Sequence, residues 1–555
     1  MQANDLETDV AVVGAGIAGA LIAWRLASSG ARVVIIDSGP QVDRAKGIAQ
    51  ALSRSPTGIP EAASPVVEWA PKPSTLDPNA YFVQTGPDLF KSGYERQVGG
   101  TTWHWLGTAI RLLPSDFRLK SEYGVGVDWP ISYDEIEPWY LQAEQTIGVA
   151  GADDEDNGAP RSGPYPMAAI PFTYSDTQFQ KAAQSLGLVV TATPQARVSA
   201  SEGYNGRPQC CGNAFCIPMC PIGAKYDATV HLDLAEKAGA TIIAEAVAHT
   251  IDIDERGLVS GIVFKRPDLS EHRLIAKQYV VAAHAIETPK LLLLSRNDRI
   301  PNGVANASDQ VGRNLMDHPT QLSYALASNP MGPYRAPLST AGIEMLRDGD
   351  FRTSRGAFRI ELGNDGWSWP GLDPVSWAQQ LIKEGHRGKD LYDQLRELNV
   401  RAVRMAALVE QLPDPASRVT LSDQLDAIGI PRPDVHYVVD DYAKQGLLAA
   451  QKQLAAIFDA LGVDEMTTVP DIQGAGHIMG TYRMGSDKSD SVTDSFGRSW
   501  DHPNLWLAGS GLFPTTGTAN PTLTIAALAL RTAPEILSEL GSLSAPATPV
   551  ASPTA

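Results

Sequence analysis

The sequence predicts an α/β fold whose nucleotide-binding domain is assembled from separate stretches of chain. Short apolar, β-branched runs at 9–13, 32–36, 241–247, 279–283 and 505–508 are typical of buried strands, and helical patterns separate several of them. A glycine-rich turn, "GAGIAG", directly follows the first run. Because the strand-like runs are scattered from one end of the chain to the other, we expect the domain to be discontinuous in sequence.

The first run begins a pattern of strand, glycine turn, helix, strand and acid. Gly14, Gly16 and Gly19 lead into the helical stretch "ALIAWRLASSG", and the next run, "ARVVIID", ends at Asp37. Such glycines let backbone N–H groups approach a pyrophosphate at the start of the helix, with the carboxylate on a ribose hydroxyl. The pattern predicts a dinucleotide site without separating FAD from NAD. The alternative is a tight turn without a ligand.

The next chemical feature is a cysteine cluster, "CCGNAFCIPMCP", which holds all 4 cysteines of the chain. A disulfide would close loops of only a few residues, and adjacent cysteines diverge too much to bind one zinc ion together. A c-type haem requires C-x-x-C-H, which is absent. An iron–sulfur cluster fits these spacings best, because closely spaced thiolates ending in Cys-Pro resemble a ferredoxin segment. The spacing leaves open whether Cys210 or Cys211 is the first ligand.

The last strand-like run leads into a second glycine turn and a second helix. "LWLAGSG" contains Gly509 and Ser510, and Asn520 and Pro521 precede the helical run "TLTIAALALR". A helix N-terminus offers free N–H donors and about half a positive charge, which suits the anionic edge of a reduced flavin. On the sequence alone, Asn520 is either a helix cap or a catalytic group.

Composition excludes several classes of partner. The formal charge of -18, from 45 basic and 63 acidic residues, argues against nucleic acid and against an anionic membrane surface. No apolar run reaches the roughly 18 to 20 residues that cross a bilayer, so we expect no direct membrane span. The first residues show no signal-peptide pattern. The segment 542–555, rich in Pro, Ala and Ser, is predicted to be a disordered tail.

Six motifs together resemble the glucose–methanol–choline (GMC) family of FAD oxidoreductases. They occur in the order of the family and are "GAGIAG", "RQVGGTTWHW" (96–105), "AIETPKLLLLS" (285–295), "VGRNLMDHP" (311–319), "HIMGTYRMG" (477–485) and "GTANPTLTIAALALR" (517–531). Within the family, the cysteine cluster is similar to that in the flavoprotein subunits of bacterial membrane-bound glucose, fructose, sorbitol and gluconate dehydrogenases. The resemblance extends from about residue 8 to 538.

The resemblance implies two domains. A Rossmann-like FAD-binding domain would comprise 1–110, 205–325 and 474–541, including an iron–sulfur segment at 208–224. A substrate domain built on an antiparallel sheet would comprise 111–204 and 326–473. Besides the glycines and Asp37, the resemblance implies FAD contacts from Gly99, Gly100, Thr101, His104, Val247, Gly509, Ser510, Asn520 and Pro521.

The resemblance also implies the chemistry. His477 would take the hydroxyl proton, since an unperturbed histidine pKa of about 6.5 suits a base near neutrality. Asn520 would bind the same substrate oxygen while hydride passes to the flavin. We interpret His318 as organising the loop near the nucleotide. His104 matches a position that carries covalent FAD in pyranose oxidases, and packing over the flavin ring is the alternative.

In the resembling dehydrogenases a 3Fe-4S cluster occupies three cysteines, which here are Cys210, Cys216 and Cys220. Such a one-electron centre would make the protein a dehydrogenase with a non-oxygen acceptor. The resemblance implies a multi-haem cytochrome c subunit as the next electron carrier and a small companion subunit with a twin-arginine signal. Together these place the protein in the periplasm, bound to the membrane through a partner. A cytoplasmic enzyme is the alternative.

The substrate stays open at the level of the sequence. The glucose and fructose enzymes have two asparagines before the catalytic histidine, where this chain has Ala475 and Gly476. A polyol, a gluconate-like acid or the C3 hydroxyl of a glycoside therefore remains an alternative. Stacking on a sugar ring and packing in the core are the two alternatives for the tryptophans of this region, Trp367, Trp369 and Trp377. A flavin oxidase and a non-enzymatic electron carrier are the competing functions.

Overall fold

A five-stranded parallel sheet forms the first half of the molecule. The computed structural model describes residues 5–54, 62–74, 77–333, 335–365 and 374–541. The strand order is β21-β12-β2-β3-β8, with bounds Leu505–Leu507, Gln278–Val281, Val10–Val13, Val33–Ile36 and Thr241–Ile243. Each strand comes from one of the five runs that the sequence predicts, so the α/β fold and its discontinuous assembly are confirmed.

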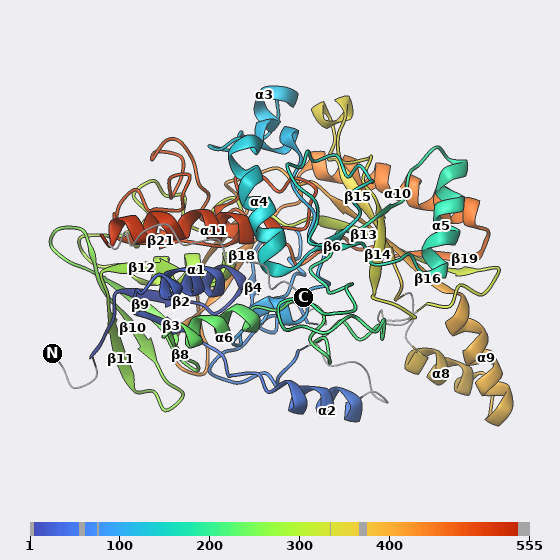
Figure 1. Cartoon of the computed structure of the whole chain (residues 1–555), viewed down its shortest axis with the longest axis horizontal. Coiled ribbons are helices and arrows are strands. Elements are labelled where there is room, and N and C mark those ends of the chain that lie inside the picture. Colours follow the sequence, from blue (N-terminus) through green and yellow to red (C-terminus); the bar gives the residue numbers. More distant parts are fainter. Residues whose placement is uncertain (1–4, 55–61, 75–76, 334, 366–373, 542–555) are drawn as a thin grey trace.

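Helices form one layer beside this sheet, as Figure 1 shows for α1 (Ile17–Ser28), α11 (Thr522–Glu539) and α6 (Thr229–Lys237). Helix α1 contacts both α11 and α6, and α4 (Tyr133–Ile147) packs on α11. A smaller sheet, in the order β1-β11-β10-β9, contributes apolar residues to the same core. Its strands are Asp5–Glu7, Glu271–Ile275, Val259–Lys265 and Val247–Ile253.

A seven-stranded sheet forms the other half of the molecule, at the right of Figure 1. Its path is β19-β13-β16-β15-β14-β7, with β20 paired to β13, and its pairings are antiparallel as predicted. The strands are Val463–Thr468, Pro319–Ala327, Ala402–Val409, Phe358–Gly363, Ser339–Ile343, Thr191–Ala192 and Gln473–Gly474. Helix α10 (Asp441–Leu461) packs on β13, β16 and β19, and α5 (Tyr174–Ser185) packs on α10. The two sheets fit the predicted pair of domains, whose exact bounds stay a prediction.

Smaller elements complete the described chain. They are the sheet β17-β18-β4 (Arg418–Leu425, Pro431–His436, Val83–Gln84), the pair β5-β6 (Ala150–Gly151, Met167–Ala168), the helices α2, α3, α7, α8 and α9 (Arg44–Arg54, Leu119–Tyr123, His284–Leu294, Pro374–Lys383, Gly388–Arg401) and four 3-10 turns (Gly100–Trp103, Pro114–Arg118, Asp350–Thr353, Ser510–Leu512). Within the described ranges, no helix combines the length and apolar character needed to cross a membrane.

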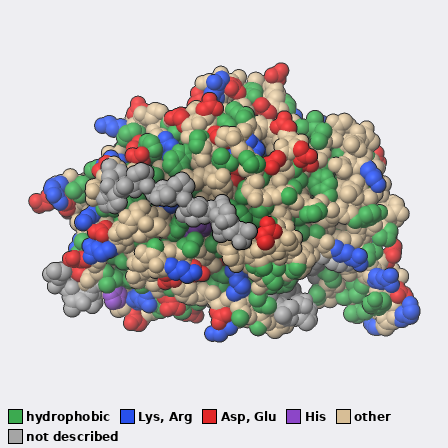
Figure 2. Space-filling model, viewed as in Figure 1, with side chains coloured by type: hydrophobic (Ala, Val, Ile, Leu, Met, Phe, Trp, Pro, Cys, Tyr) green, Lys and Arg blue, Asp and Glu red, His purple; other side chains and the backbone are tan. Residues whose placement is uncertain are grey.

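The charged surface agrees with the acidic composition. Figure 2 shows basic side chains scattered among acidic and apolar ones, without a continuous basic area on the face in view. Trp377 lies half-buried on α8, whereas Trp367, Trp369 and the predicted tail 542–555 fall outside the described residues.

Candidate active site

A cavity of about 410 Å³ is lined by residues of both large sheets. It brings together most of the residues that the sequence singles out, although they come from distant segments. The predicted residues that line it are Gly14, Gly16, Asp37, Gly100, Thr101, His104, Val247, His477, Gly509, Ser510, Asn520 and Pro521. Gly19 and Gly99 do not line it, because each packs against protein atoms instead. A Cβ at Gly19 would lie 2.0 Å from the Gly14 carbonyl oxygen, and one at Gly99 would lie 2.4 Å from Nε1 of Trp103.

The turn before α1 has the shape that a dinucleotide needs. Gly14 has φ +101°, and a Cβ there would lie 2.5 Å from the carbonyl oxygen of Ala282. By contrast, a Cβ at Gly16 would meet no protein atom within 4 Å, because Gly16 faces the cavity. The open space beside a helix N-terminus therefore fits a pyrophosphate.

Asp37 holds this turn in place. Its carboxylate accepts hydrogen bonds from Ala15 N at 2.8 Å and from Gly39 N at 3.0 Å. Burial raises the pKa of Asp37 despite these two bonds. The carboxylate also lines the cavity, so a hydrogen bond to a ribose hydroxyl stays a prediction that the geometry permits.

At the other end of the cavity, Asn520 contacts His477. Asn520 Nδ2 lies 3.2 Å from His477 Nε2, and Arg359 Nη1 donates to Asn520 Oδ1 at 3.3 Å. The cap position of α11 is Pro521, and no side chain caps the helix. The interpretation of Asn520 as a helix cap is therefore wrong, because its side chain is turned away from the helix and toward the histidine.

His318 contacts His477 directly, and its interpretation as a residue that organises the loop near the nucleotide stays a prediction. The two Nδ1 atoms are 2.8 Å apart, and His318 Nε2 lies 2.9 Å from the carbonyl oxygen of Gly517. A carbonyl only accepts, so His318 must carry its proton on Nε2 and, when neutral, accept at Nδ1. His477 must then donate from Nδ1, which leaves its Nε2 unprotonated beside Asn520.

The surroundings keep this histidine pair neutral. Burial, with the nearby His318 and Arg359, lowers the pKa of His477 well below its usual value. Burial also lowers the pKa of His318 to about 4. Asp317 fixes the backbone of both histidines by accepting from His477 N at 2.9 Å and from His318 N at 2.6 Å. Burial raises the pKa of Asp317 to about 6. The arrangement holds an unprotonated His477 Nε2 at the cavity, where it accepts a hydrogen bond from Asn520 Nδ2.

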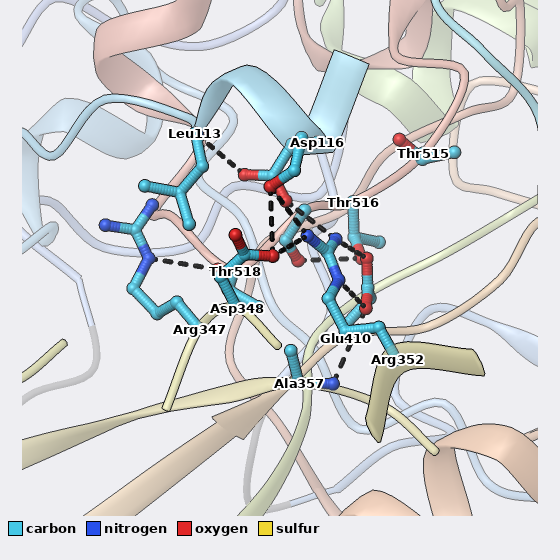
Figure 3. A network of polar contacts seen from close by, with 12 residues as sticks. Leu113, Asp116, Arg347, Asp348, Arg352, Ala357, Glu410, Thr515, Thr516 and Thr518 are labelled. Carbon is cyan, nitrogen blue, oxygen red and sulfur yellow. Dashed lines mark hydrogen bonds and ion pairs between the residues drawn. The ribbon is translucent and has the colours of Figure 1, made fainter. Parts of the chain in front are cut away.

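A buried polar network holds the loop that carries Asn520, as Figure 3 shows. Arg347 Nε donates to Thr518 Oγ1 at 3.0 Å on this loop. Arg352 donates to Asp116 at 2.8 Å and to Glu410 at 2.6 Å, and all three side chains are fully buried. Such charge-assisted bonds fix geometry, and breaking one partner of a buried pair costs about 3–5 kcal/mol. The sequence alone did not point to this network.

His104 sits on the cavity wall with its orientation set from behind. Its Nδ1 lies 2.9 Å from Glu95 Oε1, and Lys72 Nζ donates to the same oxygen at 2.7 Å. Trp105 also lines the cavity, whereas Trp103 turns away and donates to the carbonyl oxygen of Val98 at 2.8 Å. Of the two tryptophans that flank His104 in the sequence, only Trp105 therefore forms part of the cavity wall. Whether His104 bonds covalently to a flavin stays open.

The cysteines lie beside a buried cation. Arg197 Nη2 lies 3.4 Å from Cys216 Sγ, and its Nη1 lies 3.8 Å from Cys210 Sγ. Burial opposes the charge on Arg197, but the nearby thiols of Cys216, Cys210 and Cys220 leave its pKa raised. Cys211 is exposed, and all four thiols are free, so the disulfide alternative is wrong. Within the described ranges, no three His, Cys, Asp or Glu side chains are arranged to hold a metal ion.

The cysteine segment borders the cavity. Lys225 Nζ donates to the carbonyl oxygens of Trp103 at 2.7 Å and Trp105 at 2.5 Å. Arg197 Nη2 donates to the Leu106 carbonyl at 3.0 Å, and Trp105 and Leu106 line the cavity. Ile217, which directly follows Cys216, lines the cavity too, so the cysteine segment forms part of the cavity wall.

Comparison with known proteins identifies the family of the chain. Residues 93–320 and 413–529 match models of GMC oxidoreductases, and residues 12–42 match an NAD(P)-binding Rossmann-like domain. The fructose dehydrogenase large subunit of Gluconobacter japonicus is 41% identical over 97% of this chain and 99% of its own. The gluconate 2-dehydrogenase flavoprotein of Pantoea cypripedii is 24% identical over 95% of this chain and 93% of its own. The crystal structure of pyridoxine 4-oxidase from Mesorbium loti has a TM-score of 0.64 at 18% identity, covering 95% of this chain and 99% of that one, and thus shares the fold.

Proposed function

Because the chain belongs to the GMC oxidoreductase family of FAD-dependent enzymes, we propose that it is the catalytic subunit of a dehydrogenase that oxidises a CH–OH group of a sugar or polyol. The observation that carries this proposal is the unprotonated Nε2 of His477 beside Asn520 at the cavity. The similarity to the fructose dehydrogenase large subunit supports the substrate class.

His477 and Asn520 carry out the protein's part of the reaction. Nε2 of His477 accepts the proton of the substrate hydroxyl, and Nδ2 of Asn520 donates a hydrogen bond to the same oxygen. The Nδ1 proton of His477 remains bound to His318, so only one nitrogen is available to the substrate. Bound FAD supplies the acceptor for the hydride that leaves the same carbon.

The residues at the nucleotide end fit the role of holding FAD. Gly16 leaves room at the start of α1, Gly14 permits the tight turn, and Asp37 lines the cavity, where it would bind a ribose hydroxyl. Pro521, the cap position of α11, lines the cavity together with His477, so the N-terminus of this helix lies at the cavity. Gly100, Thr101, His104, Val247, Gly509 and Ser510 line the space between these two helix ends.

We further propose that Cys210, Cys216 and Cys220 would hold a 3Fe-4S cluster, which would supply a one-electron acceptor beside the flavin. Two of these thiols contact the guanidinium of Arg197, and Cys211 is exposed and apart from it. A buried cation stabilises thiolates, which are the form that binds iron. The position of the segment in the cavity wall supports a short path between the two centres.

The electron acceptor in this proposal is a multi-haem cytochrome c subunit. A relative named a large subunit implies partner subunits. A small companion with a twin-arginine signal would carry the folded chain to the periplasm, where the complex would be bound to the membrane through a partner.

Anaerobic stopped-flow absorbance tests the proposed function. Mixing with aldoses, ketoses, polyols, aldonic acids and glycosides should bleach the oxidised-flavin band for the true substrate class. A peroxide yield that matches sugar consumption in air would instead indicate an oxidase. A flavin that no compound of these classes bleaches would refute the proposal and favour a non-enzymatic electron carrier.

A further inference from the structure

Three charged side chains line the same cavity as His477 but have no part in the chemistry above. Glu361 lies on β15, Asp365 lies just beyond it, and Arg404 lies on β16. Their exposed fractions are 5%, 3% and 3%. Arg404 Nε donates to Asp365 Oδ1 at 2.7 Å, and its Nη2 donates to Glu361 Oε1 at 3.4 Å. We call these three residues the carboxylate–guanidinium cluster.

The cluster lies on the side of the antiparallel sheet that faces the cavity. Arg404, Ala406 and Leu408 alternate along β16 and line the cavity, whereas Met405 and Ala407 belong to the core shared with α10. Glu361 pairs with Ala406 across the strands, so it belongs to the same face. Packing of the sheet does not require charges there, and burying them is costly. Buried charges in a cleft indicate a functional site.

One guanidinium connects the cluster to the catalytic pair. Arg359 Nη1 lies 3.5 Å from Glu361 Oε2 and 3.3 Å from Asn520 Oδ1. The cluster therefore flanks the position of the reacting carbon. When the reacting carbon of a larger substrate lies beside His477, we expect the other groups of that substrate to reach the cluster.

The charges at this end of the cavity are balanced, without a cation in excess. Arg347, Arg359 and Arg404 are the three cations, and Glu344, Glu361 and Asp365 are the three carboxylates with which they pair, so the group is formally neutral. The other cations that line the cavity, Arg96 and Lys290, are held at the nucleotide end by Glu287 and Tyr81. An anionic substrate would meet carboxylates here without an excess cation.

We propose that the carboxylate–guanidinium cluster is a subsite that binds the distal hydroxyls of a neutral polyhydroxylated substrate and disfavours an aldonate. This inference rests on the proposed function and narrows it. Each hydroxyl can donate to a carboxylate of Glu361 or Asp365 and accept from Arg404. A substrate carboxylate can only accept, so beside the two acids it loses these bonds and is repelled.

The test compares a ketohexose, a hexitol and an aldonate of equal chain length, using steady-state kinetics with an artificial acceptor. Wild-type kcat/KM should be at least about tenfold higher for the better neutral substrate than for the aldonate. Because a hydrogen bond to a charged group contributes about 1.5–3 kcal/mol, Glu361→Gln should raise the KM of the neutral substrate roughly tenfold or more, with kcat within about twofold. Asp365→Asn should do the same. Both variants should lower the ratio between kcat/KM for the neutral substrate and kcat/KM for the aldonate.

Glu465→Gln provides the matched control, since Glu465 is exposed on β19 of the same sheet. It should leave every KM unchanged. Flavin absorbance and thermal unfolding show whether each variant is folded, and an unfolded Glu361→Gln leaves Asp365→Asn to decide. Unchanged KM values in a folded cluster variant, or a wild-type preference for the aldonate, would overturn the inference. Failure of every polyhydroxylated compound to bleach the flavin would refute the proposed function instead.

Discussion

Asn520 directs its Nδ2 to His477 Nε2 at 3.2 Å, rather than capping the helix that it precedes. This relationship fixes which nitrogen of His477 meets the substrate. Since His477 Nδ1 is committed to His318, only Nε2 has a lone pair at the cavity.

Removing the base should slow flavin reduction while FAD stays bound. A positioned general base contributes about 10²- to 10⁴-fold, so His477→Ala should lower the limiting rate of anaerobic flavin reduction by that factor. Asn520→Ala should lower it roughly tenfold or more, since one hydrogen bond to the reacting oxygen is lost. His386→Ala, on the connection between α8 and α9, is the control. The flavin of this variant should be reduced at the wild-type rate. An undiminished rate in His477→Ala would remove this residue from the mechanism.

The rate of flavin reduction should stay level between pH 8 and pH 6. The pKa of His477 is lowered by burial and by the nearby His318 and Arg359, so Nε2 remains unprotonated as the pH falls through 6.5. His318→Phe removes the acceptor of the Nδ1 proton and should lower the rate by about tenfold at every pH in this range. Stopped-flow reduction at several pH values measures both effects. A tenfold fall per pH unit below 6.5 in the wild type would contradict the assigned protonation.

Acidification should lower the stability of the protein between pH 6.5 and pH 5. Burial lowers the pKa of His231 to about 3 and the pKa of His284 and His318 to about 4. The unfolded chain therefore binds more protons than the folded protein in this window. The free energy of unfolding consequently decreases as the pH decreases. Burial raises the pKa of Asp317 to about 6 and also raises the pKa of Asp37, Asp176, Asp233 and Asp440, which opposes this effect, whereas the lowered pKa of His249 and His477 adds to it. Urea unfolding should give a lower midpoint at pH 5 than at pH 7, and an equal or higher midpoint would refute this balance.

Serine substitutions should identify the iron ligands one at a time. Cys210→Ser, Cys216→Ser and Cys220→Ser should each lose iron and acid-labile sulfide, because three thiolates hold the proposed cluster. Cys211→Ser should retain both, since Cys211 is exposed and apart from Arg197. Chemical analysis of anaerobically purified protein provides the measurement. If Cys210→Ser retains iron and Cys211→Ser loses it, then Cys211 rather than Cys210 is the ligand. A wild-type protein without iron would refute the proposed cluster.

Two glycine substitutions should separate backbone strain from steric overlap at the nucleotide turn. Gly14 and Gly30 have φ values of +101° and +89°, so alanine at either position is strained by about 1–2 kcal/mol. Only at Gly14 does the new Cβ overlap the Ala282 carbonyl oxygen, at 2.5 Å. Gly14→Ala should therefore lose most of its FAD, whereas Gly30→Ala should keep a near-stoichiometric amount. Equal FAD content in the two purified variants would show that the overlap is relieved by movement elsewhere.

The buried parallel sheet was predictable because its strands read as continuous apolar runs. All five runs became neighbours, including 505–508, which enters as the edge strand β21. The glycine turn and His477 were predictable because fixed motifs carry them. Their contacts were not, since His318 and His477 are 159 positions apart and their hydrogen bond depends on how the two sheets meet.

The carboxylate–guanidinium cluster was missed for a different reason. Charged residues that alternate with apolar ones along a strand are typical of a face exposed to solvent. Here the second face of the sheet is covered by the nucleotide half of the molecule, so Arg404 and Glu361 are enclosed rather than exposed. Single-strand patterns contain no information about that cover.

The route of the chain through the parallel sheet also bears on biosynthesis. Strand β2 is made first, its neighbour β12 follows some 270 residues later, and β21 and α11 come last. A nascent chain on the ribosome therefore has no complete pocket until β21 and α11 have been made. The early apolar strands lack part of their sheet during that interval, and we expect flavin to bind only after α11 has been synthesised.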